Sequence, residues 1–119
     1  MSTLKEKVED LNQMILEGKI LDAFDKYYAP DVVMQDNDTP VRKGFESCRK
    51  FEESFVNNLT AFRGAKVNNV LISEDAGVAA IDWWMDYSHK EWGDRNYHQV
   101  AVQRWKDGKI VSEKFVYNN

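Results

Sequence analysis

Asp36 is the residue of this sequence whose type and position most clearly suggest chemistry. It ends a predicted strand, residues 32–36, and shares a face with Val32 and Met34 because side chains alternate along a strand. In an aromatic cavity its carboxylate would lose hydration, which favours proton uptake near neutral pH and suits a base that removes a proton beside a carbonyl group. Alternatively, it accepts backbone N–H bonds from residues 37–39 and anchors the following loop. Both interpretations are open from the sequence.

The other reactive side chains are weaker candidates. Cys48 lies on the apolar side of a predicted helix, where a core residue is more common than a nucleophile. His89 falls in a predicted loop and His98 in a predicted strand. No spacing of His, Cys or carboxylates suggests a metal site, since Asp36 and Asp38 form a pair and not a cage. Because a Gly-rich dinucleotide motif and a P-loop are both missing, the sequence predicts no metal and no cofactor.

Periodicity predicts three helices in the first half of the chain. The first begins at a capping box of Thr3 and Glu6 and ends near Gly18, a residue that suits a helix C-terminus. The second is short and is stopped by Pro30. In the third, residues 44–59, apolar side chains spaced by three and four share one side, and the other side carries Glu, Lys and Arg.

The last third of the chain predicts a meandering antiparallel sheet. Polar and apolar residues alternate in three consecutive runs, roughly 77–87, 97–105 and 110–117. Residues 66–73 predict a further strand, and residues 89–96 predict a long polar hairpin loop. The order helix, helix, strand, helix and four strands predicts an α+β fold with a strongly twisted sheet that curls around the helices.

Composition bounds the class of protein. A chain of 119 residues predicts a single domain, 1–119. A formal net charge of −4, with no Lys or Arg cluster longer than a dipeptide, argues against a nucleic-acid partner. Cys48 is the only cysteine, and residues 1–10 lack the apolar core of a signal peptide, which favours a cytoplasmic location. No apolar stretch approaches the roughly 20 residues that cross a bilayer, so no membrane partner is expected.

Three segments carry a family resemblance: residues 27–36, Gly44 before a predicted helix, and residues 105–111. Together with the order of elements, which covers nearly the whole chain, they resemble the nuclear transport factor two-like superfamily. Within it, the chain is most similar to SnoaL-like and ketosteroid isomerase-like proteins. The resemblance implies a cystatin-like, cone-shaped roll, in which a curved, mixed and mostly antiparallel sheet wraps around three helices.

The resemblance also implies which face of the sheet is inward. The inward set is largely aromatic and apolar, as expected of a cavity for a small, largely apolar molecule. Its members are Ile81, Trp83, Met85, Tyr87, Tyr97, Gln99, Ala101, Gln103, Trp105, Val111, Glu113, Phe115 and Tyr117. The expected ligand-binding residues are Asn12, Tyr28, Met34, Phe55, Trp83, Met85, Gln99, Ala101, Phe115 and Tyr117. The same aromatic side chains could instead fill the core completely.

Glu113 and Gln103 complete the expected catalytic set with Asp36. On the implied register both lie inside on neighbouring strands, where the amide of Gln103 or Gln99 could donate to the Glu113 carboxylate. Asp36 and Glu113 could form an acid–base pair whose environments separate their proton affinities. The cluster could equally orient a ligand, and a slip of one residue would expose Glu113.

The resemblance places Asp36 at the general-base position of ketosteroid isomerase-like enzymes. It puts Asn12 where the oxyanion-binding tyrosine would lie and Ala101 where the protonated aspartic acid would lie. Because losing an oxyanion donor typically costs about 3 kcal/mol of transition-state stabilisation, a steroid isomerase is not expected. Asn12, Tyr28 or Tyr117 could supply replacement donors.

The outward set of side chains predicts a homodimer. It holds an apolar patch of a kind that usually marks a contact, and proteins of the resembled family often dimerise through this face. We expect the interface to contain Trp84, Val100, Val102 and Arg104. Cross-strand or intersubunit ion pairs could join acidic to basic members of this face: Asp82 or Asp86 to Arg104 or Lys114. A sheet partly covered by its own termini is the alternative.

The leading hypothesis is a protein with an apolar pocket that binds a small molecule. As an enzyme it would be a cofactor-free isomerase, cyclase or dehydratase, with Asp36 as general base and Gln103 and Glu113 as orienting or acid groups. The alternatives are a non-catalytic ligand-binding module and a protein-interaction module. A carboxylate of Asp36 bound to its own loop would favour the former, and a filled cavity with a large exposed patch the latter.

Overall fold

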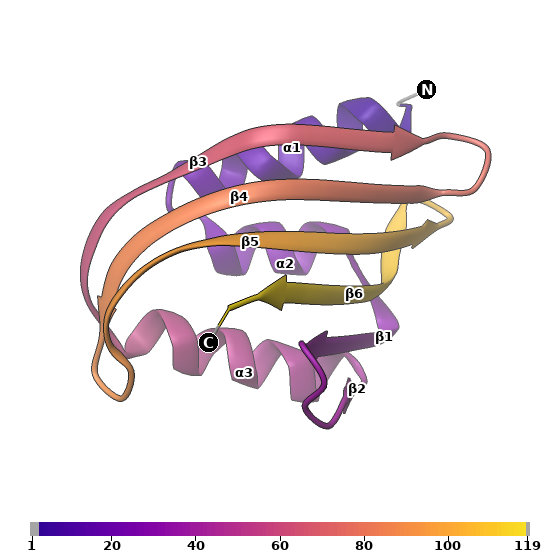
Figure 1. Cartoon of the computed structure of the whole chain (residues 1–119). Helices are drawn as coiled ribbons and strands as arrows, with labels where there is room; N and C mark the ends of the chain where they lie inside the picture. Colours follow the sequence, from indigo (N-terminus) through magenta and orange to yellow (C-terminus); the bar gives the residue numbers. More distant parts are fainter. Residues whose placement is uncertain (1–2, 119) are drawn as a thin grey trace.

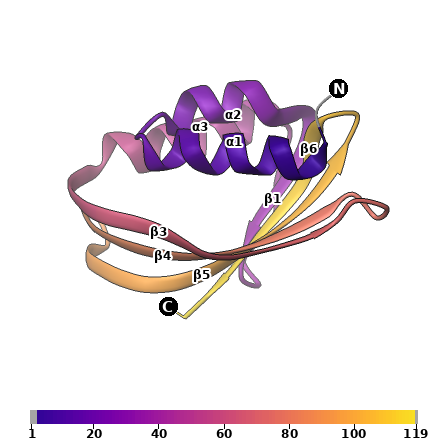
Figure 2. The ribbon, with the colours of Figure 1, turned by 90° about the horizontal axis from the view of Figure 1, so that it is seen from above.

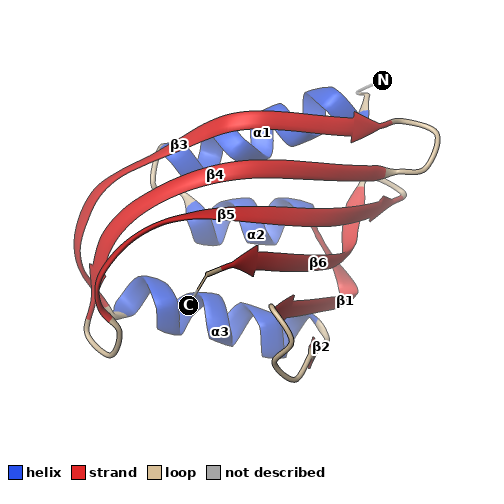
Figure 3. Ribbon diagram, viewed as in Figure 1, coloured by secondary structure: helices blue, strands red, loops and turns tan. Residues whose placement is uncertain are grey.

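The computed structural model describes residues 3–118, which form three helices on one side of a six-stranded sheet (Figures 1 and 3). The helices are α1 (Leu4–Leu16), α2 (Ile20–Tyr27) and α3 (Phe45–Asn57). The strands are β1 (Tyr28–Asp36), β2 (Arg42–Lys43), β3 (Leu59–Ser73), β4 (Val78–His89), β5 (Gly93–Lys106) and β6 (Lys109–Tyr117). Their order across the sheet is β2-β1-β6-β5-β4-β3, with β1 and β6 parallel and all other neighbours antiparallel. The predicted α+β class and mixed, mostly antiparallel sheet are confirmed.

The sheet curves around the helix layer (Figure 2). The pairing of β3 with β4 shifts register at three places, next to Ala61, Gly64 and Asn69. A shift of this kind adds a residue to one strand, bends that strand and increases its twist. The long strands therefore present a concave face to the helices, and the core lies between the two layers.

A further register shift in the β5–β6 pairing corrects one predicted inward residue. The shift lies at Trp105, which pairs with Ile110, whereas Gln103 pairs with Glu113. Ile110 is fully buried and Val111 only partly. The prediction that Val111 faces inward with Glu113 is therefore wrong. The bulge puts Ile110, and not Val111, in the inward position.

The start of α1 follows the predicted capping box and has a second cap from a distant turn. Thr3 and Glu6 exchange the expected side-chain and backbone hydrogen bonds. In addition, the Glu74 carboxylate accepts hydrogen bonds from the backbone N–H groups of Leu4 and Lys5, both at 3.1 Å. Because these N–H groups have no partner inside the helix, the turn between β3 and β4 fixes the position of α1.

Several element boundaries differ from the prediction. The strand β1 begins at Tyr28, directly after α2, and contains Pro30. Proline has no N–H to donate, and it is accommodated here because the β1–β6 pairing is irregular between Tyr28 and Val33. Similarly, β3 begins at Leu59 instead of residue 66, and most of the predicted loop 89–96 belongs to β4 and β5.

The turn between β3 and β4 requires a glycine. Gly77 has a φ of +68°, and a Cβ atom at this position would lie 2.8 Å from the backbone oxygen of Trp105. The close approach is held by a hydrogen bond of 2.7 Å from the Trp105 N–H to the Gly77 oxygen. This turn thus packs directly against the end of β5.

No helix within residues 3–118 combines the length and the apolar character needed to span a membrane. In the same part of the chain, His, Cys, Asp and Glu side chains do not gather in groups of three or more that could hold a metal ion.

Candidate functional site

A cavity of about 700 Å³, partly open to solvent, lies between the helices and the concave face of the sheet. Its volume is in the range of ordinary small-molecule sites. Its wall is mainly aromatic and aliphatic, with contributions from all three helices and from β1, β4, β5 and β6. The charged side chains that line it are Asp36, Arg42, Glu52, Arg95 and Glu113. The aromatic side chains therefore do not fill the interior. A completely filled core, the alternative that the sequence left open, is wrong.

Most of the predicted site residues lie on this wall. All three predicted catalytic residues, Asp36, Gln103 and Glu113, line the cavity. So do the predicted ligand-binding residues Tyr28, Phe55, Trp83, Met85, Gln99, Ala101, Phe115 and Tyr117. Asn12 and Met34 are buried in the core and do not line it. Because its side chain does not line the cavity, Asn12 is not placed to act as a replacement oxyanion donor there.

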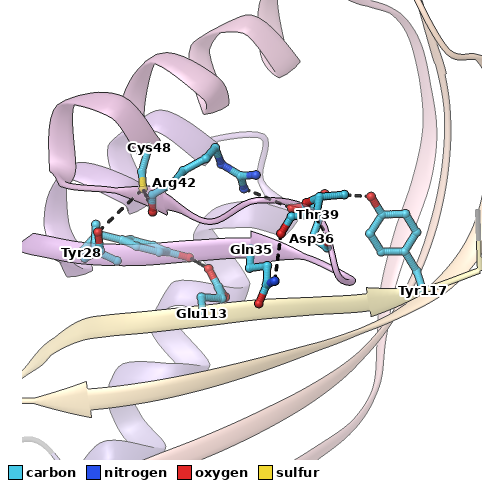
Figure 4. Close-up of polar contacts among 9 residues, drawn as sticks. Tyr28, Gln35, Asp36, Thr39, Arg42, Cys48, Glu113 and Tyr117 are labelled. Carbon is cyan, nitrogen blue, oxygen red and sulfur yellow. Dashed lines mark hydrogen bonds and ion pairs between the residues drawn. The ribbon is translucent and has the colours of Figure 1, made fainter.

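Glu113 is the centre of a buried hydrogen-bond network, of which Figure 4 shows the contact with Tyr28. Its side chain is only 3% exposed; Oε1 accepts a hydrogen bond from the Tyr28 hydroxyl and Oε2 accepts one of 2.8 Å from Gln103 Nε2. The Oε1 atom of Gln103 in turn accepts a hydrogen bond of 3.0 Å from the indole N–H of Trp105. The glutamate thus lies inside, opposite Gln103, as the unslipped register predicts.

The network keeps a proton available near neutral pH. Burial raises the pKa of Glu113 to about 7, although the hydrogen bonds from Tyr28 and Gln103 favour its charged form. Burial also raises the pKa of Tyr28 well above its ordinary value, and the nearby Glu113 charge adds to this effect. The Tyr28 hydroxyl therefore stays protonated, whereas Glu113 can exist in both protonation states.

Glu52 is a second cavity carboxyl, which the sequence analysis missed. It was assigned to the solvated side of the third helix, but it is partly buried and lines the cavity. Within residues 3–118 its carboxyl group has neither a hydrogen bond nor an ion pair. Burial, reinforced by the negative charge of Glu113, raises the pKa of Glu52 to about 7. The signal in the sequence is its position between Phe51 and Phe55, which both line the cavity.

Asp36 lines the cavity with both carboxylate oxygens already engaged. Oδ1 accepts a hydrogen bond of 3.1 Å from Arg42 Nη2, and Oδ2 accepts one of 2.8 Å from the Tyr117 hydroxyl (Figure 4). The next turn is held instead by the backbone oxygen of Asp36, which accepts hydrogen bonds from the N–H and hydroxyl of Thr39. The predicted anchoring of the loop by the carboxylate is therefore wrong, because the carboxylate faces Arg42 and Tyr117.

Arg42 is held in place from two sides. Besides its ion pair with Asp36, its guanidinium carbon lies 3.8 Å from the centre of the Phe51 ring. Such stacking on an aromatic face stabilises a partly desolvated cation. The sequence analysis did not identify Arg42, because it predicted no strand between Asp36 and Gly44, where the short strand β2 lies.

The cysteine and the histidines lie away from the cavity wall. Cys48 is fully buried, and burial raises the pKa of its thiol, which disfavours a nucleophilic thiolate. His89 is not in a loop as predicted but is buried at the end of β4, stacked on Trp92 at 3.8 Å. His98 lies opposite Trp84 on the outward face.

The outward face has different ion pairs from those expected. Asp86 pairs with Arg63 at 2.8 Å, and Asp82 accepts a hydrogen bond of 2.9 Å from Asn69. The predicted cross-strand pairs of these aspartates with Arg104 or Lys114 are wrong, because the polar partners come from the neighbouring strand β3, whereas the intersubunit pairs stay a prediction. Among the predicted interface residues, Trp84 is partly buried and donates its indole N–H to Asn96.

Comparisons with known proteins agree with this fold. Residues 8–113 match the SnoaL-like domain family. No match was found among curated protein sequences. The structure is similar to that of a candidate SnoaL-like polyketide cyclase from Mesorhizobium loti, with 24% identity and a TM-score of 0.83 over 96% of this chain and 98% of that one.

Two other solved structures are similar at lower identity. One is a candidate isomerase from Bacillus subtilis, with 15% identity and a TM-score of 0.80 over 98% of this chain and 90% of that one. The other is a ketosteroid isomerase-like protein from Catenulispora acidiphila in complex with trimethylamine, with 12% identity and a TM-score of 0.71 over 88% and 80%. Since the family match spans most of the sequence and these structures share the fold, the chain belongs to the SnoaL-like domain family.

Proposed function

We propose that this protein binds a small, largely apolar molecule and transfers a proton on it without a cofactor, as an isomerase, cyclase or dehydratase does. The observation that carries the proposal is the group of three carboxyls on a mainly aromatic and aliphatic cavity wall, Asp36, Glu52 and Glu113. Two of them, Glu52 and Glu113, have a pKa raised to about 7 by burial. Groups with such values both accept and donate protons near neutral pH.

In this proposal Asp36 is the general base. Its ion pair with Arg42 and its hydrogen bond from Tyr117 fix the direction of the carboxylate. Each carboxylate oxygen has a second lone pair, so Asp36 can still accept a proton from a ligand while these contacts persist. The fixed geometry supports the positioning that proton abstraction requires.

Glu113 and Gln103 are the acid and orienting groups. Glu113 shares the cavity with Asp36 but is held by neutral donors, Tyr28 and Gln103, instead of a cation. Such a difference in environment separates an acid from a base. The descriptions of the similar proteins as a candidate cyclase and a candidate isomerase fit this class of reaction.

The test uses a small bicyclic aromatic ketone, 2-tetralone, in D₂O. Proton NMR follows the loss of the hydrogens beside its carbonyl group as they exchange for deuterium. We expect the protein to accelerate exchange above the buffer rate. Asp36→Asn should reduce this acceleration at least roughly 100-fold, because a general base typically contributes that much or more, and should leave ketone binding nearly unchanged. Asp82→Asn, a similar change on the outward face, serves as the control.

Two results would contradict this proposal. If 2-tetralone binds but is not exchanged by the wild-type protein, the non-catalytic binding module becomes the better account. If Asp36→Asn exchanges as fast as the wild type, Asp36 is not the base.

We further propose that two copies associate through the outward face of the sheet. Val100 and Val116 are paired neighbours on this face and remain 37% and 48% exposed. Arg104, also exposed, has no ion pair within residues 3–118 and is available to a second subunit. A cytoplasmic location stays a prediction from the sequence.

A further inference from the structure

The cavity has a second polar group, at the hairpin end of β4 and β5. In the β4–β5 pairing Tyr87 lies opposite Arg95 and Met85 opposite Tyr97, and all four side chains line the cavity. Arg95 precedes Gln103 by eight positions, or roughly 26 Å of curved strand at about 3.3 Å per residue. The group of Arg95, Tyr87 and Tyr97 is therefore distinct from the Glu113 network.

Arg95 supplies an unpaired positive charge to the wall. Its guanidinium carbon lies 4.7 Å from the centre of the Tyr97 ring. It forms no ion pair with an acidic residue in the described part of the chain, whereas the other guanidinium on the wall, that of Arg42, is paired with Asp36. A partly buried cation with no anionic partner is unfavourable, so this position favours an anionic group of a ligand.

The tyrosine pair adds a hydrogen-bond donor beside this charge. The hydroxyl oxygens of Tyr87 and Tyr97 are 2.8 Å apart, and one of them donates to the other. The accepting hydroxyl keeps its own proton for a further acceptor. Burial raises the pKa of both tyrosines, and the positive charge of Arg95 only partly opposes this effect. Both hydroxyls therefore stay protonated at neutral pH.

We propose that Arg95 and the Tyr87–Tyr97 hydroxyl pair bind the carboxylate of an apolar carboxylic acid. A planar guanidinium matches a carboxylate with two parallel hydrogen bonds, and a single unpaired cation matches a monoanion better than a phosphate dianion. The aromatic wall between this group and Glu113, which includes Trp83 and Phe115, would hold the apolar part of the ligand. The inference rests on the proposed function only in using the same cavity, because it concerns the ligand class and not the reaction.

The position of Arg95 also keeps the carboxylate of a ligand away from the carboxyl group of Glu113. A carboxylate bound at Arg95 lies far along β5 from the position of Glu113, so a ligand anchored there directs its uncharged end toward Glu113. The opposite orientation would bring an anion close to Glu52 and Glu113, which is electrostatically unfavourable.

Isothermal titration calorimetry with three probes of matched size tests this inference at pH 6: 2-naphthoate, the neutral 2-naphthamide and the cation 2-naphthylmethylammonium. We expect the wild-type protein to bind 2-naphthoate at least roughly tenfold more tightly than the amide, as one charge-assisted contact provides. Arg95→Gln should remove this preference by weakening naphthoate binding about tenfold and leave the amide unchanged. Arg95→Lys should retain part of the preference.

Lys106→Gln is the control, because Lys106 lies on the same strand but is exposed and does not line the cavity. This substitution also removes one positive charge, and it should change the affinity for neither 2-naphthoate nor 2-naphthamide. Tyr97→Phe keeps the ring and removes the hydroxyl, and it should weaken naphthoate binding several-fold. This second variant tests the site independently should Arg95→Gln fail to fold, which circular dichroism would reveal.

The outcomes distinguish the anion site from the proposed function. Equal affinity for the acid and the amide, unaffected by Arg95→Gln, would overturn the anion site while leaving ligand binding in the cavity intact. A preference for the cationic probe would also overturn it. If none of the probes binds, both the anion site and the proposed apolar ligand are contradicted.

Discussion

At the scale of single residues, Glu113 determines much of the response of the cavity to pH. Its folded-state pKa of about 7 lies above the ordinary pKa of a glutamate, 4.5. The folded protein therefore binds more protons than the unfolded chain between these values. Stability must fall as pH rises from about 4.5 to about 7, and the loss is complete above the folded-state pKa.

The first prediction is that Glu113→Gln flattens this pH dependence. A pKa shift of this size lowers the free energy of unfolding of the wild-type protein by on the order of 3 kcal/mol between pH 5 and pH 8, because each pKa unit is worth about 1.4 kcal/mol. The amide keeps the shape of the side chain and cannot ionise. Urea unfolding at the two pH values measures the effect, with the exposed Glu46→Gln as the control. An unchanged pH dependence in Glu113→Gln would contradict the placement of the buried carboxyl.

The sequence predicted some of these residues better than others. Asp36, Gln103 and Glu113 could be placed inside because period-two alternation and the family resemblance agree on their strand register. The ion pair of Asp36 with Arg42 could not be predicted, since it depends on the path of the turn between β1 and β2. Glu52 was missed because helical periodicity distinguishes only an apolar from a polar side of the helix. It does not show that the cavity extends to the boundary between these two sides, where Glu52 lies.

At the scale of elements, the turn between β3 and β4 is fixed by Gly77. The second prediction is that Gly77→Ala destabilises the fold by about 2–3 kcal/mol, because it combines an unfavourable positive φ with a backbone contact of 2.8 Å. Gly93→Ala is the matched control: its φ of +72° is similar, but an added Cβ meets nothing within 4 Å, so it should cost only about 1 kcal/mol. Equal urea midpoints for the two variants would contradict the close packing of this turn on Trp105.

Element boundaries were the part of the fold that the sequence specified least. Helical spacing and caps predicted α1 and α3 well, because each buries one continuous side. The start of β3 was missed because register shifts at Ala61 and Gly64 interrupt the two-residue alternation. The hairpin strands near His89 were assigned to a loop because their polar composition resembles a loop, although the backbone pairing continues to Gly93.

At the scale of the whole molecule, the curved sheet has one face toward the cavity and one toward solvent. The third prediction is that the protein is a dimer in solution and that Val100→Glu makes it monomeric. A carboxylate at this position would be desolvated in a contact between two apolar faces. Sedimentation velocity measures the change, and Glu91→Gln in the distant hairpin turn should leave the dimer intact. A monomeric wild-type protein at micromolar concentration would contradict the proposed interface.

The measurement that tests the central claim most directly is a ¹³C NMR titration of the glutamate side-chain carboxyls, assigned with Glu52→Gln and Glu113→Gln. The account predicts that these two carboxyls titrate near pH 7, because both line an apolar cavity. If Glu52 and Glu113 both titrate below pH 5, the cavity does not hold a proton for exchange near neutral pH, and the proposed acid–base function loses its physical basis.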